Sequence, residues 1–284
     1  MTDGLLVVDK PRGPTSHDLV DAVRRATGMR RVGHAGTLDP MATGVMVVGL
    51  GRSTRLLRFV QSQLKEYLAS VRFGIGTDTL DAEGGEVWRQ PMEFQEADLE
   101  AVLPSFLGQI EQVPPMFSAV KVKGAALHHA ARRGQEVARP PRTIEVHHLE
   151  MVDFQAGPFP VATLRVVCST GTYVRALADD LARALSGRAH LEALRRLRVG
   201  SFKVEEAMLM SGLSDWRRHL LEEASAVAAL PQLVVKPDEV ASVTSGRSLT
   251  SEIQGEFAVL DASGALLAVY RGEQGIARPE VVLA

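Results

Sequence analysis

One aspartate, Asp39, stands in a loop whose residue types suit close contact with a ligand. Gly33, Gly36 and Gly44 surround it, and glycine permits tight turns and close approach of the backbone to a bound molecule. Pro40 follows directly and disfavours helical geometry at the aspartate. A carboxylate presented in this way can act as a nucleophile or a base. The Asp-Pro pair alone, however, favours a hydrogen-bonded turn that only shapes the loop.

Two other motifs that could bind a phosphate or a calcium ion lack required residues. Residues 44–51 have the glycine spacing of a phosphate-binding loop but lack the lysine and the serine or threonine that must follow. Asp78 could open a calcium loop, but Leu80 occupies the next acidic position. We therefore expect the acidic residues of 78–85 to cap a helix or to form a hydrogen-bonded turn.

The histidines and the single cysteine indicate no metal site. The pairs His128-His129 and His147-His148 are adjacent in sequence, so their side chains diverge on a helix or strand. Cys168 lies in an apolar strand and is expected to be a small core residue. One cysteine excludes an intramolecular disulfide and fits a reducing compartment.

The charge is unevenly distributed although the net charge is only −2. Residues 1–60 and 121–200 carry +4 and +6, whereas residues 61–120 and 201–284 carry −7 and −5. Binding of phosphates depends on local potential, so the two basic blocks permit a nucleic-acid partner. Composition alone favours the alternative, that the blocks are uneven but solvated surface charge.

The elements that must position Asp39 are predicted on both sides of it. Residues 5–8 form an apolar run typical of a buried strand, and residues 45–48 form another. Between them, Thr15 or Ser16 can cap a helix that stops at Gly28.

Later elements follow from periodicity. Alternation over residues 65–73 predicts a strand with four residues on one face: Tyr67, Ala69, Val71 and Phe73. We expect a helix over 96–107 and a strand over 161–168. A further helix should open at Thr170 or Thr172, and residues 205–230 should be mostly helical.

Two stretches differ from this pattern. Residues 113–143 are rich in proline, lysine and arginine, and their middle, 125–133, could form a helix on a basic loop. After Pro231, short apolar runs alternate with turns, which predicts a small β-rich domain beginning near residue 232.

The chain has the composition of a soluble globular protein, with 45% hydrophobic and 23% charged residues among 284. No apolar run reaches the roughly 18 residues of a membrane span. The first residues lack the basic and hydrophobic regions of a secretory signal. We therefore expect a cytoplasmic protein.

Several motifs in order along residues 4–200 resemble those of the TruB family of tRNA pseudouridine synthases. They are specific as a set because their order and spacing also agree with the family. The segments that carry the resemblance are 10–16, 33–44, 65–67, 76–81, 114–121, 171–175 and 189–196.

The resemblance implies an α+β fold with a mixed, largely antiparallel sheet and flanking helices. It implies a catalytic domain over residues 1–231, in which residues 113–143 form an inserted RNA-binding thumb. The tail, residues 232–284, resembles a reduced PUA-type RNA-binding domain.

The resemblance also implies the chemistry: isomerisation of the T-loop uridine at tRNA position 55, after the base is flipped out. Asp39 would be the catalytic carboxylate, and the sequence does not choose between attack on C1′ and removal of the 2′-proton. Tyr67 would stack on the uracil and serve as a base for the C5 proton, and Arg175 would pair with Asp39. The substrate pocket would include His34, Leu194 and Tyr173. Lys10 and Pro11 would buttress the catalytic loop.

The same resemblance implies a tRNA partner bound at its T-arm, with no cofactor, no metal, no membrane and no required protein partner. A monomer is expected. The residues implied in phosphate contacts are Lys121, Lys123, Arg132, Arg133, Arg139 and Arg142.

Three alternatives stay open at this stage. The same scaffold could bind or fold RNA without catalysis, and tRNA folding could also be a second activity. An Asp-based hydrolase would not need the basic stretch or the tail. A related synthase could act on another RNA.

Overall fold

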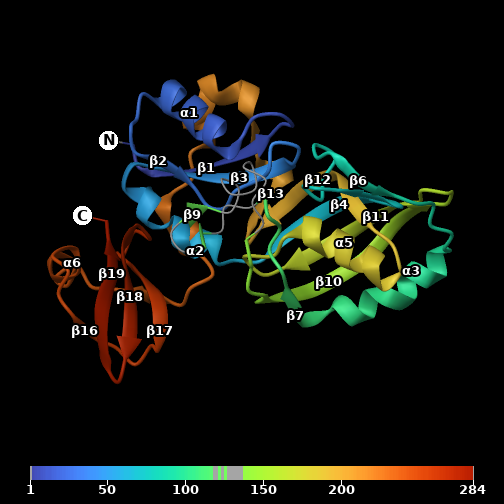
Figure 1. The fold of residues 1–284 in the computed structure, drawn as a ribbon. Helices are drawn as coiled ribbons and strands as arrows, with labels where there is room; N and C mark the ends of the chain where they lie inside the picture. Colours follow the sequence, from blue (N-terminus) through green and yellow to red (C-terminus); the bar gives the residue numbers. More distant parts are fainter. Residues whose placement is uncertain (1, 118–120, 123–124, 127–136, 284) are drawn as a thin grey trace. The chain divides into compact units, whose positions relative to one another are not determined.

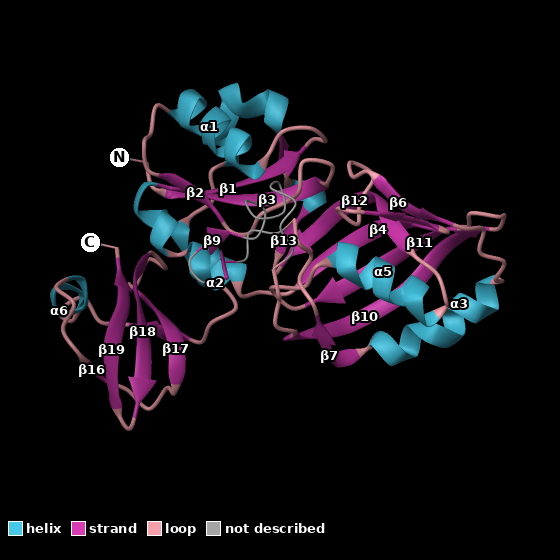
Figure 2. Cartoon of the chain, in the orientation of Figure 1, coloured by secondary structure: helices cyan, strands magenta, loops and turns pink. Residues whose placement is uncertain are grey.

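The computed structural model describes residues 2–283 apart from 118–120, 123–124 and 127–136. The described residues form two compact units (Figure 1). The terminal unit comprises Met1–Asp39, Val45–Ser62 and Phe202–Ala284, and the central unit comprises Pro40–Gly44 and Gln63–Ser201. Strands outweigh helices in both (Figure 2).

The terminal unit has a small sheet built on apolar strands. Its strands are β1 (Gly4–Lys10), β2 (Val32–His34), β3 (Thr43–Leu50) from Val45 onward, and β14 (Met208–Leu209). β1 lies between β14 and β3, in parallel with β14, while β2 runs antiparallel to β3. Both predicted apolar strands are confirmed. Nearly all of their residues are buried, which explains why their sequences are continuously apolar and do not alternate between apolar and polar residues.

Helix α1 (Ser16–Thr27) has the caps that the sequence predicts. Thr15 is the N-cap residue; its hydroxyl accepts from the Asp18 amide, and the Asp18 carboxylate accepts from the Thr15 amide. Gly28 ends the helix with a left-handed φ of 71°. The chain then turns into β2, which leads directly to the Asp39 loop.

The helical prediction for residues 205–230 is only partly correct. The structure describes every residue of this stretch, and there it forms short 3₁₀ segments: η3 (Val204–Glu206), η4 (Met210–His219) and η5 (Glu223–Val227). Serine and glycine interrupt the stretch, and buried apolar anchors such as Leu213 and Trp216 are widely spaced. A continuous apolar face for an α-helix is therefore missing. Two more short helices follow β3: η1 (Gly51–Arg55) and α2 (Leu57–Gln61).

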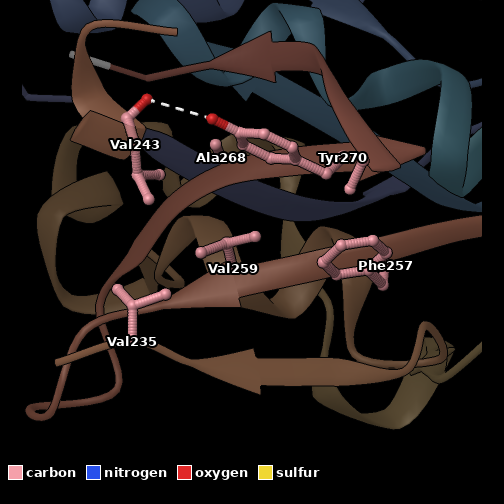
Figure 3. Close-up of a cluster of buried hydrophobic side chains, with 7 residues drawn as sticks. Val235, Val243, Phe257, Val259, Ala268 and Tyr270 are labelled. Atoms are coloured by element: carbon pink, nitrogen blue, oxygen red, sulfur yellow. Dashed lines mark hydrogen bonds between the residues drawn. The ribbon is translucent and has the colours of Figure 1, made fainter. Parts of the chain in front are cut away.

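The C-terminal part of the terminal unit is a sheet, as the alternation of short runs and turns predicts. Its strands are β15 (Gln232–Val234), β16 (Leu249–Thr250), β17 (Gly255–Leu260), β18 (Leu266–Glu273) and β19 (Ile276–Val282), in the order β15-β17-β18-β19-β16. Helix α6 (Val240–Thr244) covers the core, where Phe257 and Tyr270 are fully buried (Figure 3). The Tyr270 hydroxyl donates to the Arg247 carbonyl at 2.7 Å, so the ring's polar end is satisfied.

Three arginines of η1 and α2 bind the C-terminal part of the terminal unit. Arg52 and Arg55 donate to main-chain carbonyls of the last residues of the chain, those of Leu283 and Val282 respectively. Arg58 pairs with Glu280 of β19 at 2.8 Å. Hydrogen bonds from Arg58, followed by those from Arg271, hold the pKa of Glu280 below its usual value. These cations are thus engaged with the protein's own backbone and carboxylates.

The central unit is built on a mixed, largely antiparallel sheet. Its strands are β4 (Lys65–Phe73), β7 (Gly108–Gln112), β10 (Arg142–Gln155), β11 (Val161–Cys168) and β12 (Ala189–Val199). Their order is β12-β4-β11-β10-β7, and every neighbouring pair is antiparallel. Thr43 and Gly44, the first residues of β3, pair in parallel with β12.

Gly44 is required by this parallel pairing. Its φ is 105°, and a β-carbon placed there would lie 2.1 Å from the Arg196 carbonyl oxygen. Only glycine lets the two backbones approach this closely.

Strand β4 confirms the predicted alternation over residues 65–73. Tyr67, Ala69, Val71 and Phe73 are buried, and the residues between them are partly exposed. Lys65 continues the buried face, although a lysine is not expected there from hydrophobicity.

The remaining elements of the central unit frame this sheet. They are the hairpin β5 (Ile75–Thr77) and β6 (Glu86–Arg89), the pair β8 (Lys121–Val122) and β9 (Ala125–Ala126), and the helices α3 (Glu96–Val102), η2 (Leu103–Phe106) and α5 (Val174–Ala184). The terminal unit also contains β13 (Phe202–Lys203). Ala125 and Ala126 are strand residues, and the rest of the helix predicted over 125–133 lies outside the described residues. Within the described chain, no helix has the length and hydropathy needed to cross a membrane.

The α+β class is thus confirmed, together with a β-rich C-terminal part. The domain boundary near residue 232 and the thumb over 113–143 stay predictions.

Helix α5 packs against β4 and β12 and begins later than predicted. Tyr173 is its N-cap residue, without a side-chain cap, while the Thr172 hydroxyl donates to the Ser169 carbonyl at 3.0 Å. The predicted threonine cap is therefore wrong, because the Thr172 side chain is used in the preceding turn. Within α5, Asp179 is buried and accepts from Arg183 and Arg188 at 2.9 and 2.7 Å.

Asp180 should make stability fall as pH rises. Burial, and then the charge of Asp179, raise the pKa of Asp180 to about 6 from 3.8. The folded chain therefore holds this proton more tightly than the unfolded chain, and stability is lost as pH rises from 3.8 to about 6. We expect Asp180→Asn to raise the free energy of unfolding by about 2 kcal/mol at pH 7 and by less than half of that at pH 4.5.

Urea unfolding at the two pH values measures the effect. Asp153→Asn, an exposed aspartate on β10, is the control and should change little at either pH. Equal effects of Asp180→Asn at both pH values would contradict the assignment.

Candidate active site

The Asp39 loop is held by a serine at the start of α1. The Ser16 hydroxyl accepts from the Leu38 amide at 2.8 Å and donates to the Leu38 carbonyl at 2.9 Å. Both residues are 4 % exposed, so neither contact competes with bulk water. The amide and the carbonyl of Leu38, next to Asp39, are therefore both held by hydrogen bonds. Asp39 itself is partly exposed.

Lys10 shapes the loop that precedes α1. Its ammonium is fully buried and donates to the carbonyls of Pro11 and Pro14 at 3.0 and 2.7 Å. A buried ammonium needs such partners, so the contacts order the Pro-rich turn that leads into Thr15. Lys10 and Pro11 thus lie where a supporting role is feasible. Their support of catalysis stays a prediction.

His34 is the last residue of β2 and pairs with Val48 of β3. It is partly exposed and lies five residues before Asp39 in the chain. Its predicted contact with the T-loop is not tested by this position.

Tyr67 and Leu194 share one buried face of the central sheet. Tyr67 lies opposite Arg196, and Ala69 lies opposite Leu194, across the β4–β12 pair. Residues paired in this way point to the same side of a sheet. Tyr67, Leu194 and Arg196 are 7 %, 8 % and 1 % exposed, so an aromatic ring, an apolar chain and a guanidinium are buried together.

Lys65 adds a second buried cation to this face. It is 6 % exposed and donates to the Gln63 carbonyl at 2.8 Å. Burial, and then the charge of Arg196, lower the pKa of Lys65 to about 8. The sequence reasoning missed Lys65 as a site residue, although strand alternation places it on the same face as Tyr67.

Arg175, the second residue of α5, binds two segments through three acceptors. Its Nη1 donates to the Thr79 carbonyl at 2.8 Å and to the Asp81 carboxylate at 3.2 Å. Its Nη2 donates to the Phe117 carbonyl at 2.9 Å. Arg175 and Asp81 are both 5 % exposed, which makes this a buried ion pair with additional hydrogen bonds.

Asp81 belongs to the acidic turn that the sequence predicts as hydrogen-bonded, and this prediction is confirmed. Its carboxylate accepts from the Thr79 hydroxyl at 2.6 Å and from the Glu83 amide at 3.1 Å. Asp78 accepts from the Gly85 amide at 2.8 Å. The sequence did not indicate the partner of Asp81, because Arg175 lies 94 residues away.

Tyr173 is anchored by a glutamine that the sequence reasoning also missed. The Gln112 side chain accepts from the Tyr173 amide at 2.8 Å and donates to its carbonyl at 3.1 Å. Gln112 is 2 % exposed and ends β7. The start of α5 is thus tied to the strand that precedes the basic stretch.

The basic residues of that stretch are only partly described. Arg139 donates to the Pro114 carbonyl at 3.1 Å, and Arg142 begins β10 opposite Gln112. Lys121 is in β8, paired with Ala126. The other predicted phosphate contacts, Lys123, Arg132 and Arg133, lie outside the described residues.

Among the described residues, no group of histidine, cysteine and acidic side chains could hold a metal ion. Cys168 is fully buried on β11, and burial raises the pKa of its thiol to about 11. It is a core residue, as predicted.

The structure therefore brings the predicted residues together in two sets. In the terminal unit, Lys10, Pro11 and His34 flank the loop that carries Asp39. In the central unit, Tyr67 and Leu194 share a buried face, while Arg175 and Tyr173 open α5. The first set contains a carboxylate, a group that can act at a sugar carbon, and the second contains a buried aromatic ring, a group on which a planar base can stack.

The family model described as "TruB family pseudouridylate synthase (N terminal domain)" matches residues 24–174, which include Asp39, Tyr67 and Tyr173. The chain belongs to the TruB family. A second family model, that of the tRNA pseudouridylate synthase B C-terminal domain, matches residues 175–241. The chain is therefore a pseudouridine synthase, an isomerase, as the resemblance of its motifs predicts.

Curated TruB relatives align along most of the chain. The tRNA pseudouridine synthase B of Symbiobacterium thermophilum is 45% identical to this chain, and the alignment covers 86% of this chain and 82% of that protein. The protein of that name from Thermobifida fusca is 43% identical, covering 100% and 99%.

A solved structure supports the fold of this TruB chain. A Cbf5-Nop10-Gar1 complex contains a chain with a TM-score of 0.77 and 27% identity, covering 98% of this chain and 83% of that one.

Proposed function

We propose that this chain converts the uridine at position 55 in the T-loop of tRNA to pseudouridine. The observation that carries this proposal is its likeness to curated proteins named tRNA pseudouridine synthase B, at 43–45% identity across at least 82% of their length. The T-loop target and the roles of individual residues are inferred from the motifs.

The reaction breaks the uridine N1–C1′ bond, rotates the uracil and forms a C5–C1′ bond. The hydrogen at C5 leaves as a proton, and N1 gains one, so no electron is exchanged. Asp39 acts either as the nucleophile at C1′ or as the base at the 2′-position. Both routes need an ionised carboxylate beside the sugar, and the Ser16–Leu38 contacts support a fixed position for it.

Tyr67 stacks on the flipped uracil and takes the C5 proton, and Leu194 forms the apolar floor beneath the base. Their shared buried face supports this assignment, because unstacked bases bind best on aromatic and apolar surfaces. His34 fills the space that the uridine leaves in the T-loop. Tyr173 lines the pocket from the start of α5.

Arg175 pairs with the Asp39 carboxylate and keeps it ionised and oriented. The contacts of Arg175 with Asp81, Thr79 and Phe117 support this role, because they fix a guanidinium that would otherwise be mobile. Lys65 and Arg196 add positive charge near Tyr67, which favours a phosphate or carboxylate there.

Tritium release from a T-arm stem-loop labelled at uridine C5 tests the function. We expect release by the wild-type protein from an RNA with uridine at position 55, and none when cytidine replaces that uridine and label remains elsewhere. Release from both RNAs would refute the target assignment.

The basic stretch should contribute to RNA binding through its arginines. We expect Arg132→Gln with Arg133→Gln to weaken T-arm binding and to reduce the slope of log K against log salt by roughly 2, because two phosphate contacts are lost. Filter binding across a salt series measures this. The matched control is Arg217→Gln with Arg218→Gln, an adjacent pair in η4 whose Arg217 stacks on Trp216. An unchanged slope would remove Arg132 and Arg133 from the RNA footprint.

We further propose that the chain acts as a monomer in the cytoplasm, without a protein partner, and that its T-arm binding gives it a second role in tRNA folding. Light scattering of the purified protein with and without tRNA tests the oligomeric state. Aminoacylation of tRNA refolded with the Asp39→Asn variant tests the folding role, since we expect that variant to bind tRNA without catalysing the reaction.

A further inference from the structure

The hydroxyl of Ser16 does more than begin a helix. It closes a two-bond contact with the main chain of Leu38, directly before Asp39, across 22 residues of sequence. We propose that Ser16 is a positioning residue that sets the Asp39 carboxylate for the reaction, an inference that rests on the proposed function.

The first argument is the hydrogen-bonding need of the loop. Residues 35–42 lie between β2 and β3 and contain no helix or strand. Leu38 is 4 % exposed, so its amide and carbonyl would destabilise the folded chain if they were buried without hydrogen-bond partners. One serine hydroxyl satisfies both groups, since it can donate and accept at once. Alanine at position 16 would leave both of them without this partner.

The second argument is the rigidity of the serine itself. Ser16 is the first residue of α1, and the buried side chains of Leu19, Val20 and Val23 anchor that helix. Lys10 orders the turn before it through the carbonyls of Pro11 and Pro14. The hydroxyl of Ser16 is therefore presented from a fixed point. This chain of contacts runs from Lys10 through α1 to the residue beside Asp39.

The third argument concerns what the contact can move. Leu38 and Asp39 share a peptide unit, so a shift of the Leu38 carbonyl rotates the backbone that carries the carboxylate. A misplacement of about 1 Å in a reacting group can lower a rate by about 100-fold. Ser16 thus acts through Leu38 on Asp39 and does not itself contact the substrate.

The test compares Ser16→Ala with Thr15→Ala, which removes a neighbouring hydroxyl that caps the same helix and is hydrogen-bonded to Asp18. We expect Ser16→Ala to lower the single-turnover rate of tritium release about 10- to 100-fold, with the Kd for the T-arm changed less than threefold. Thr15→Ala should lower thermal stability at least as much but keep the rate within threefold. Ser16→Cys, with a weaker donor and acceptor, should lie between wild type and Ser16→Ala.

Hydrogen–deuterium exchange supplies a readout that needs no RNA. The Leu38 amide should exchange faster in Ser16→Ala and remain protected in Thr15→Ala.

The outcomes separate the two proposals. If wild type is active and Ser16→Ala matches it, or if both alanine variants lose rate equally, the positioning role is overturned while the proposed function stands. If wild type releases no tritium from the T-arm, the proposed function is overturned. Exchange at Leu38 then decides the role of Ser16: unchanged protection in Ser16→Ala overturns it, and selective loss of protection supports it.

Discussion

Asp39→Asn should abolish tritium release from the T-arm, with a rate at least about 10⁴-fold below wild type. The amide has nearly the same shape as the carboxylate, but it can neither attack C1′ nor accept the 2′-proton. Its neighbour Leu38 stays bound to Ser16, so the loop keeps its backbone contacts. We therefore expect the variant to bind the T-arm within a few-fold of wild type.

Single-turnover tritium release and filter binding measure the two quantities. The control is Asp21→Asn, which removes the same charge from an aspartate of α1 whose side chain is 42% exposed and forms an ion pair with Arg24 at 2.9 Å. It should leave the rate within twofold. An Asp39→Asn variant that keeps more than about 1% of the wild-type rate would show that another group is the catalytic carboxylate. A pure RNA-binding protein would retain its whole function in this variant.

Arg175→Met should lower both activity and stability. It leaves Asp81 as a buried carboxylate without its cation, which costs about 3 kcal/mol. We expect the rate of tritium release to fall about 100- to 1,000-fold, because Arg175 is assigned to hold the Asp39 carboxylate. Arg175→Lys should not restore either property, since one ammonium cannot reach three acceptors on two segments.

A second substitution separates the two effects. Asp81→Asn removes the buried charge but keeps a side chain that can accept from Thr79 and Glu83. Combined with Arg175→Met, it should restore part of the free energy of unfolding in urea while the rate stays low. A rate that recovers together with stability would reduce Arg175 to a structural role.

Much of the secondary structure could be predicted because local rules govern it. The alternation over residues 65–73 reproduces β4, and the caps at Thr15 and Gly28 reproduce α1. These features depend on neighbouring residues alone. The 3₁₀ segments of residues 204–227 could not be foreseen, because isolated apolar anchors do not distinguish them from an α-helix.

The strand order was beyond the reach of periodicity, since β12 pairs with β4 although more than a hundred residues separate them. The same limit applies to the candidate site. Asp39, Tyr67 and Arg175 follow from motifs, but the partners Ser16, Gln112 and Asp81 act through contacts between distant segments. A hydroxyl or an amide that binds a distant main chain has no sequence signature.

The terminal unit joins the two ends of the chain, and this has a consequence for synthesis on the ribosome. Residues 1–62 are made before β14, η4, η5 and the C-terminal sheet, which come from residue 202 onward. At about 5–20 residues per second, the intervening 139 residues take roughly 7–28 s to be made. The central unit consists of residues 63–201 and the short segment 40–44. It can therefore fold during that interval. Strand β1 meanwhile lacks its partner β14, so chaperones that shield nascent chains should act on residues 1–62.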